Sequence, residues 1–146
     1  MNPPAFLPAI RELVRCYQSF ESYSSRHVRS MGLTTPQFDI IATLGNTPGM
    51  TFKELGDKTL ITKGTLTGVV DRLEAKNLVR RVALPADGRC QVVQLTPKGE
   101  AVFAEVFPAH LAYVGKVFAG LVPAELQQAQ DTLKRLGSLF NNAQVS

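Results

Sequence analysis

The side chains best suited to chemistry lie close together in Thr62-Lys63-Gly64-Thr65-Leu66-Thr67, at the predicted start of a helix. Hydroxyl groups and the unpaired N–H groups of a helix start hydrogen-bond to phosphates and base edges, and a lysine can reach guanine. Glycine permits close approach of another backbone. An ordinary amphipathic helix with solvated threonines would have the same composition, so this segment indicates nucleic-acid binding only together with its neighbours.

A predicted β-hairpin follows this helix. Residues 79–83 and 90–95 are short strand-like segments, and Asp87-Gly88 between them permits a tight turn. Arg89 follows the turn, where a long cation could enter a narrow minor groove and its negative potential. We expect Asp87 to orient Arg89 for that insertion. The alternative is a surface turn with a weak ion pair.

Two capped helices precede the hairpin. Thr51-Phe52-Lys53-Glu54 has the pattern of a capping box, and after a turn at residues 58–61 we expect Thr62 to cap a second helix that runs to about Lys76. Two short helices followed by a hairpin are typical of a winged helix-turn-helix, which places its second helix in the major groove of DNA. The positions of that helix predicted to point inward are Leu66, Val69, Val70 and Leu73.

The predicted DNA-binding residues come from the second helix and the hairpin. Arg72 either reaches a phosphate or pairs with a neighbouring acid. The full set is Thr62, Lys63, Gly64, Thr65, Thr67, Arg72, Arg80, Asp87 and Arg89.

Basic residues are concentrated in the same part of the chain. Residues 51–95 carry eight lysines and arginines and five acids, so they supply +3 of the net charge of +4 of the 146 residues. A local basic excess on a reading element is typical of a polyanion binder, although the same charges could solvate a surface. With 45% hydrophobic and 19% charged residues, the composition indicates a soluble globular protein with a core of its own.

Three apolar helical stripes flank this region. The first helix, about residues 4–31, and the last, which begins near Pro123, carry apolar residues alternately three and four positions apart. A long helix opened by Thr96-Pro97 lies between them, and its apolar positions cover more than one face. One winged helix cannot bury three stripes, so we expect two copies of the chain to pair. An intramolecular helical bundle is the alternative.

The predicted fold class is therefore mainly α (α+β), a winged helix-turn-helix with a helical dimerisation region formed by the N- and C-terminal helices. A further helix from about Thr35 to Gly45, opened by the capping box Thr34-Thr35-Pro36-Gln37, belongs to the reading region. Residues 1–33 and 97–146 form the dimerisation region and residues 34–96 the DNA-binding region, within a single intertwined domain.

Aromatic and histidine side chains are the candidates for binding a small molecule. Tyr17, Phe38 and Tyr113 could line an aromatic pocket, and His27 and His110 could bind an anion. Each of them also fits a helical core, where a buried and hydrogen-bonded histidine is the commoner finding. No cluster of His, Cys and Glu has metal-ligand spacing, so no metal or other cofactor is expected. A nucleophile with its base and a glycine-rich phosphate loop are missing, so we do not expect an enzyme.

The cysteines and the N-terminus indicate the cytoplasm. Cys16 and Cys90 do not form a disulfide framework and suit a reducing compartment. The first residues lack the charged region and apolar run of a signal peptide, and no apolar stretch is expected to span a membrane.

Taken in order, these motifs resemble the MarR family of bacterial transcriptional regulators over nearly the whole chain. Asn77 stands where that family usually has glycine, and asparagine also tolerates the left-handed conformation needed there. The matching segments are Gly32-Leu33-Thr34, Gln37-Phe38, Thr51-Phe52-Lys53-Glu54-Leu55, Thr62-Lys63-Gly64-Thr65-Leu66-Thr67, Val70-Asp71-Arg72-Leu73-Glu74, Leu78-Val79-Arg80-Arg81, Asp87-Gly88-Arg89 and Leu95-Thr96-Pro97-Lys98-Gly99.

The resemblance implies a homodimer on a palindromic operator in double-stranded DNA. It also implies a repressor that a small, frequently anionic aromatic effector releases from DNA. Pro108 lies inside the long helix, where a proline removes a backbone hydrogen bond, and we expect it to set the separation of the reading heads. Two alternatives remain open, namely a thiol- or peroxide-sensing regulator that acts through Cys16, and a winged-helix protein-interaction module that does not bind DNA.

Overall fold

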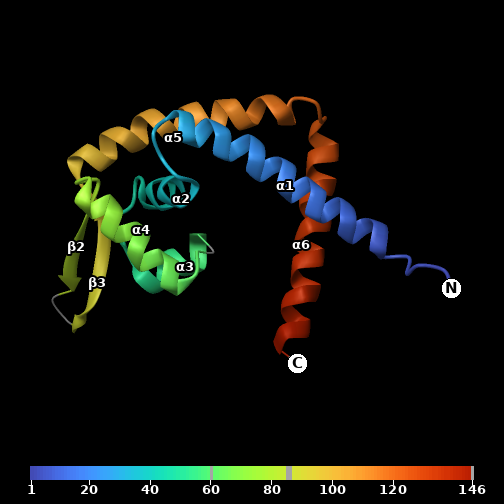
Figure 1. The fold of residues 1–146 in the computed structure, drawn as a ribbon, viewed down its shortest axis with the longest axis horizontal. Helices are drawn as coiled ribbons and strands as arrows, with labels where there is room; N and C mark the ends of the chain where they lie inside the picture. The colour runs from blue at the N-terminus through green and yellow to red at the C-terminus, as the bar shows by residue number, and fades with distance from the viewer. Residues whose placement is uncertain (60, 85–86, 146) are drawn as a thin grey trace. The chain divides into compact units, whose positions relative to one another are not determined.

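The computed structural model describes residues 1–59, 61–84 and 87–145, of which residues 87–89 and 145 are described by their backbone alone. Six helices and three strands follow one another in this part of the chain (Figure 1). Their order is α1 (Leu7–Ser30), α2 (Thr35–Leu44), β1 (Met50–Thr51), α3 (Phe52–Thr59), α4 (Lys63–Ala75), β2 (Val79–Leu84), β3 (Asp87–Leu95), α5 (Pro97–Phe118) and α6 (Pro123–Val145). The predicted winged helix-turn-helix is confirmed.

Two predicted capping boxes begin α2 and α3. The Thr34 hydroxyl accepts a hydrogen bond from the Gln37 N–H at 3.3 Å, and the Gln37 side-chain oxygen accepts one from the Thr34 N–H at 3.1 Å. Thr51 and Glu54 make the same reciprocal pair at 3.1 and 3.4 Å. Each box satisfies helix-start N–H groups that would otherwise lack partners, so the sequence determines where both helices begin.

Helix α4 begins differently from the prediction. Thr62 has the extended backbone of an N-cap residue, but its side chain makes no cap hydrogen bond. Its hydroxyl instead donates to the Thr65 hydroxyl at 3.1 Å. The expected side-chain cap is therefore wrong, because the two threonine hydroxyls bond to each other. At its other end the helix stops just before Asn77, which has the predicted left-handed backbone with φ 61°.

The strands form a three-stranded antiparallel sheet in the order β1-β3-β2. Val79 pairs with Leu95 and Val82 with Val92, and the register shifts near Ala83 and Leu84. The hairpin of β2 and β3 lies beside α4 in Figure 1. Strand β1 was not predicted, because two residues are too few for a recognisable alternation.

A single apolar core holds the reading elements together. It lies in the first of two compact units, Met1–His110, and the second unit begins at Leu111. Helices α2, α3 and α4, the sheet, and parts of α1 and α5 contribute side chains to it. Its fully buried members with less than 2% exposure are Val28, Ile40, Ile41, Leu44, Leu55, Leu66, Val70, Leu73, Val79 and Val93.

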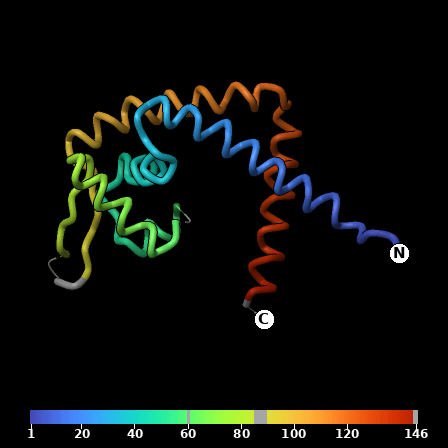
Figure 2. The backbone as a smooth tube through the Cα atoms, in the orientation of Figure 1, coloured from blue at the N-terminus to red at the C-terminus, as the bar shows by residue number. Residues whose placement is uncertain are grey.

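The start of α5 is attached closely to the end of α4. Thr96 donates its hydroxyl hydrogen to the Asn77 carbonyl at 2.6 Å and accepts a hydrogen bond from the Gly99 N–H at 3.0 Å. A Cβ at Gly99 would come within 2.0 Å of the Leu78 carbonyl oxygen, so only glycine allows this approach. Figure 2 shows the backbone passing directly from the end of β3 into α5.

Large apolar side chains remain exposed on the long helices of the single chain. By length and composition α5 could cross a membrane, so the expectation that no stretch would qualify is wrong, although core helices of soluble proteins pass the same test. The exposed residues of α1 and α6, with Phe6 just before α1, include Phe6, Ile10, Leu13, Val14, Tyr17, Phe20, Leu126, Leu133, Leu136, Leu139 and Phe140.

Candidate nucleic-acid interface

Helix α4 separates its apolar residues from its polar ones along opposite sides. Leu66, Val69, Val70 and Leu73 are at most 4% exposed, as their spacing predicted. Packing of that side against the core fixes the direction in which the other side points. The predicted DNA-binding residues of α4 therefore share an exposed surface, which consists of Lys63, Gly64, Thr65, Thr67 and Arg72 with Thr62 just before them.

Two glycines of α4, Gly64 and Gly68, add no side chain to this surface. A Cβ added at Gly64 or at Gly68 would meet no atom within 4 Å. The four-residue spacing puts both on the same side of the helix. Neither glycine is needed for packing, so both leave room for an approaching partner. Gly68 was not among the predicted site residues.

Two arginines, one on α4 and one on β2, add positive charge. Arg72 is exposed and makes no ion pair within the described part of the chain, which is against its predicted alternative pairing with a neighbouring acid. Arg80 is also exposed, and its Nε donates to the side-chain oxygen of Gln94 at 3.1 Å. Gln94 in turn donates to the Pro48 carbonyl at 3.0 Å. This chain of contacts holds Arg80 on the outer side of the hairpin.

Asp87 and Arg89 are the predicted pair at the tip of the wing, which is the hairpin of β2 and β3, and the structure describes them by their backbone alone. The backbones of Asp87, Gly88 and Arg89 belong to β3, and Asp87 pairs with Leu84, so the expected turn at Asp87-Gly88 is wrong, because the strand pairing already includes these residues. The proposed orientation of the Arg89 side chain by Asp87 concerns atoms outside the described residues, so it stays a prediction.

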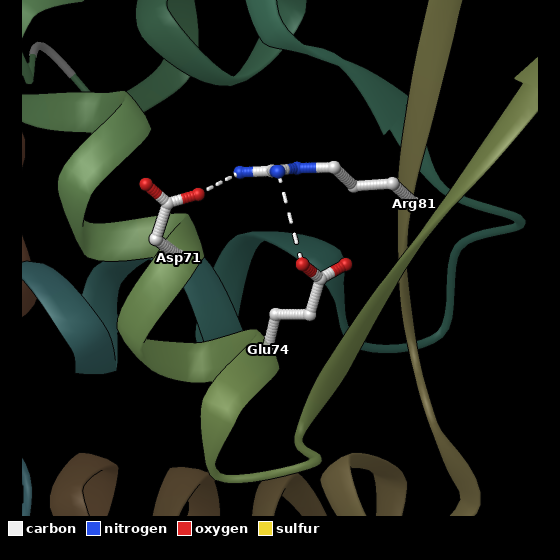
Figure 3. A network of polar contacts seen from close by, with 3 residues as sticks. All are labelled: Asp71, Glu74 and Arg81. Carbon is white, nitrogen blue, oxygen red and sulfur yellow. Dashed lines mark hydrogen bonds and ion pairs between the residues drawn. The ribbon is translucent and has the colours of Figure 1, made fainter.

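Arg81, which was not predicted as a site residue, connects the hairpin to α4. Its guanidinium forms ion pairs with Asp71 and Glu74 of α4, as Figure 3 shows. The signal available in the sequence was two acids three residues apart on one helix and a basic residue soon after it. That signal is weak, because Arg80 fits it equally well.

Three of the five predicted effector residues meet at a second place, between α1, α2 and α5. The Nδ1 atoms of His27 and His110 are 2.9 Å apart, and Phe38 meets the His110 ring edge-on at a centroid distance of 4.6 Å. Ser24, which was not predicted, lies 3.0 Å from His110 Nε2 through its hydroxyl. Burial and the neighbouring His27 lower the pKa of His110. His110 is therefore a buried, hydrogen-bonded histidine, as the alternative interpretation of these candidates described.

The remaining two effector candidates are Tyr17 and Tyr113. Tyr17 is 61% exposed and lies ten residues before His27 on α1, about 15 Å away by helical rise. Tyr113 belongs to the second compact unit. Among the described residues, no group of three or more His, Cys, Asp or Glu side chains is placed to hold a metal.

Asp39 of α2 leads to a prediction about pH. Burial raises the pKa of this carboxyl from 3.8 to about 6. The folded state therefore binds the proton more tightly, so this contribution to stability is full below pH 4 and is lost as the pH rises through 6. We expect Asp39→Asn to raise the free energy of unfolding by about 1 kcal/mol at pH 7, after allowance for solvent screening, and to leave it unchanged at pH 4.

Urea unfolding of wild type and Asp39→Asn at several pH values measures this difference. His110 contributes with the opposite sign, because its lowered pKa makes the folded state more stable as the pH rises toward 6.5, above which this contribution is constant. That contribution is common to both proteins and cancels in the comparison. A wild type as stable as the variant at pH 7 would contradict the raised pKa of Asp39.

A helix with an exposed polar side over an apolar core, followed by a hairpin, defines a winged-helix DNA-binding protein. Comparisons with known proteins agree. A model described as MarR family matches residues 31–89. The HTH-type transcriptional regulator MhqR of Bacillus subtilis (strain 168) is 33% identical over 125 residues, which are 86% of this chain and 86% of MhqR. The chain belongs to the MarR family, and it is a DNA-binding transcriptional regulator.

Two solved structures add information about function in relatives. Sco3205, a MarR family transcriptional regulator from Streptomyces coelicolor in complex with DNA, matches with a TM-score of 0.84 and 25% identity over 94% of this chain and 89% of Sco3205. Bordetella bronchiseptica BpsR, whose DNA binding is regulated by 6-hydroxynicotinic acid, matches with a TM-score of 0.82 and 27% identity over 94% of this chain and 98% of BpsR. The family is one of transcriptional regulators and not one of enzymes.

Proposed function

We propose that this protein is a cytoplasmic, dimeric repressor that binds a palindromic operator and leaves it when a small aromatic acid binds. The observation that carries the proposal is the exposed polar surface of α4, whose hydroxyls, glycines and cations lie directly opposite its buried apolar side. A helix packed in this way can enter the major groove without disturbing the core.

Each element has a separate role on DNA. Thr62, Thr65 and Thr67 hydrogen-bond to phosphates and base edges near the start of α4, where the helix dipole also favours anions. Lys63, Arg72 and Arg80 contact phosphates, and Gly64 allows the backbone to approach. Asp87 and Arg89 act at the minor groove.

Two copies pair through the helices outside the DNA-binding region. Residues 1–33 and 97–146 serve this purpose, and residues 34–96 read DNA. The exposed apolar side chains of α1 and α6 support the pairing, because such large apolar surfaces are uncommon on monomers. A symmetric pair presents two copies of α4, so its operator has two related half-sites.

The cluster of His27, Phe38 and His110 is the proposed effector site. An aromatic ring would pack against Phe38, and a carboxylate would accept a hydrogen bond from a histidine N–H. The regulation of BpsR by an aromatic acid supports this class of effector. Tyr17 and Tyr113 remain candidates that the second copy of the chain could complete. Peroxide sensing by Cys16, which is exposed, is the second candidate, and release of DNA by peroxide would favour it.

Fluorescence anisotropy with DNA from upstream of the protein's own gene tests the proposal. Scrambled DNA of the same length, two salt concentrations, and the variants Lys63→Ala and Arg72→Ala complete the experiment, with Lys134→Ala of α6 as the matched control. We expect tighter binding to the upstream DNA, a steep salt dependence, and a smaller salt slope by about one for each α4 variant but not for Lys134→Ala.

Addition of aromatic acids to the bound complex then tests release. Equal, weak binding to both DNAs would contradict recognition of that site. If every aromatic acid leaves the DNA bound but peroxide releases it, the signal is an oxidant and not an aromatic acid.

A further inference from the structure

We propose that Arg81 is a positioning residue for DNA recognition, which holds the wing at a fixed angle to α4 and offsets part of the negative charge of Asp71 and Glu74. The inference rests on the proposed DNA binding and adds a residue that does not itself contact DNA. Arg81 lies on β2, one residue after Arg80.

The guanidinium of Arg81 lies between two carboxylates of α4. Its Nη2 pairs with Asp71 Oδ1, and its Nη1 is 3.7 Å from Glu74 Oε1. Figure 3 shows the planar end of Arg81 reaching from the strand across to the helix. A planar fork can serve two acceptors at once, which a lysine ammonium cannot do with the same geometry.

A third contact extends the connection to α3. The Cζ atom of Arg81 lies 5.6 Å from the centre of the Phe52 ring, and Phe52 is the first residue of α3. One side chain therefore contacts three elements of the DNA-binding region, which are α3, α4 and the wing. A cation over an aromatic ring is favourable when it is withdrawn from water, and the Arg81 side chain is only 25% exposed.

Burial separates Arg81 from the residues proposed to contact DNA. The side chains of Asp71 and Glu74 are 56% and 43% exposed, more than Arg81 between them. Successive residues of a strand point to opposite sides, so Arg80 faces outward while Arg81 faces α4. Arg81 Nε is buried and has no hydrogen-bond partner among the described residues, so the side chain is held by its Nη groups and by Phe52.

The positions of the two acids explain why they need a cation. Gly64, Thr67, Asp71 and Glu74 are spaced three and four residues apart, so they form one row along α4. Unpaired carboxylates in that row would repel the phosphates that the start of the helix attracts. Arg81 offsets this repulsion and uses the same contacts to fix the wing.

Three variants separate the positioning role from the charge. They are Arg81→Gln, Arg81→Lys, and a triple variant that combines Arg81→Gln with Asp71→Asn and Glu74→Gln. Arg80→Gln is the matched comparison, because it removes the neighbouring charge from the outer side of the same strand. Operator and scrambled DNA are titrated in parallel, with thermal melting to confirm folding.

We expect Arg81→Gln to reduce operator affinity at least tenfold and to reduce the ratio of operator to scrambled binding. Arg81→Lys should recover only part of that loss. The triple variant should regain binding to scrambled DNA while its ratio stays low, because the charge is balanced but the wing is free. Arg80→Gln should weaken both DNAs alike and preserve the ratio.

An unchanged ratio in Arg81→Gln would overturn the inference, and so would full recovery of operator affinity in the triple variant. These outcomes differ from failure of the proposed function, in which wild type itself would not prefer the operator and the inference would fall with it.

Discussion

Replacement of Leu133 by glutamate will convert the protein to a monomer and reduce operator affinity at least a hundredfold. Leu133 is 56% exposed in the single chain and lies on one helical side with Leu126, Leu136 and Phe140. A carboxylate buried in an apolar interface costs several kcal/mol. A monomer reads one half-site and loses the gain that comes from binding two at once. Light scattering measures the mass, and anisotropy measures operator binding.

Ser138→Glu is the matched control for this experiment. It adds the same charge five residues later, which places it about 140° around α6 from Leu133. We expect this variant to remain dimeric and to bind the operator as wild type does. A dimeric Leu133→Glu with unchanged binding would show that the apolar side of α6 does not join two copies.

The second large effect is expected at Gly64, where alanine should make the protein more stable but a poorer DNA binder. A Cβ at Gly64 meets nothing within 4 Å, so it costs no packing in the free protein. Alanine is favoured over glycine in a helix by up to about 1 kcal/mol. The same methyl group would occupy the space that we propose DNA to approach, and we expect a loss of about tenfold in operator affinity, or about 1.4 kcal/mol.

Gly137→Ala in α6 controls for the general effect of a stiffer helix. Gly137 also has open space at its Cβ position, but it lies outside the reading unit. Chemical denaturation and anisotropy on both variants separate stability from binding. A Gly64→Ala protein that binds the operator as tightly as wild type would mean that DNA does not come close to this glycine.

The starts of α2 and α3 could be predicted because their determinants are local. Thr34 and Gln37, like Thr51 and Glu54, are three residues apart, and the geometry of a first helical turn brings such pairs together wherever they occur. The start of α4 could not be predicted in the same detail. The Thr62 hydroxyl could bond either to an N–H group of the first helical turn or to the Thr65 hydroxyl three residues later. Only the folded structure decides between these two partners.

The candidate DNA-binding surface was predictable in part for the same reason. The spacing of Leu66, Val69, Val70 and Leu73 determined which side of α4 is buried, and so which residues remain outside. The choice between the adjacent arginines of β2 was not available from spacing. Their directions depend on the register between β2 and β3 and on the packing of the hairpin against α4.

By itself, the sequence determined the class of fold, most helix limits, and the family, because periodicity, capping pairs and motif order are written in neighbouring residues. The tertiary structure alone decided which distant side chains meet. His27 and His110 are 83 positions apart, and Arg81 reaches α4 only after the chain has turned back on itself. Contacts of this kind depend on how whole elements pack, since the free energy that selects them comes from the shared core and not from any local segment.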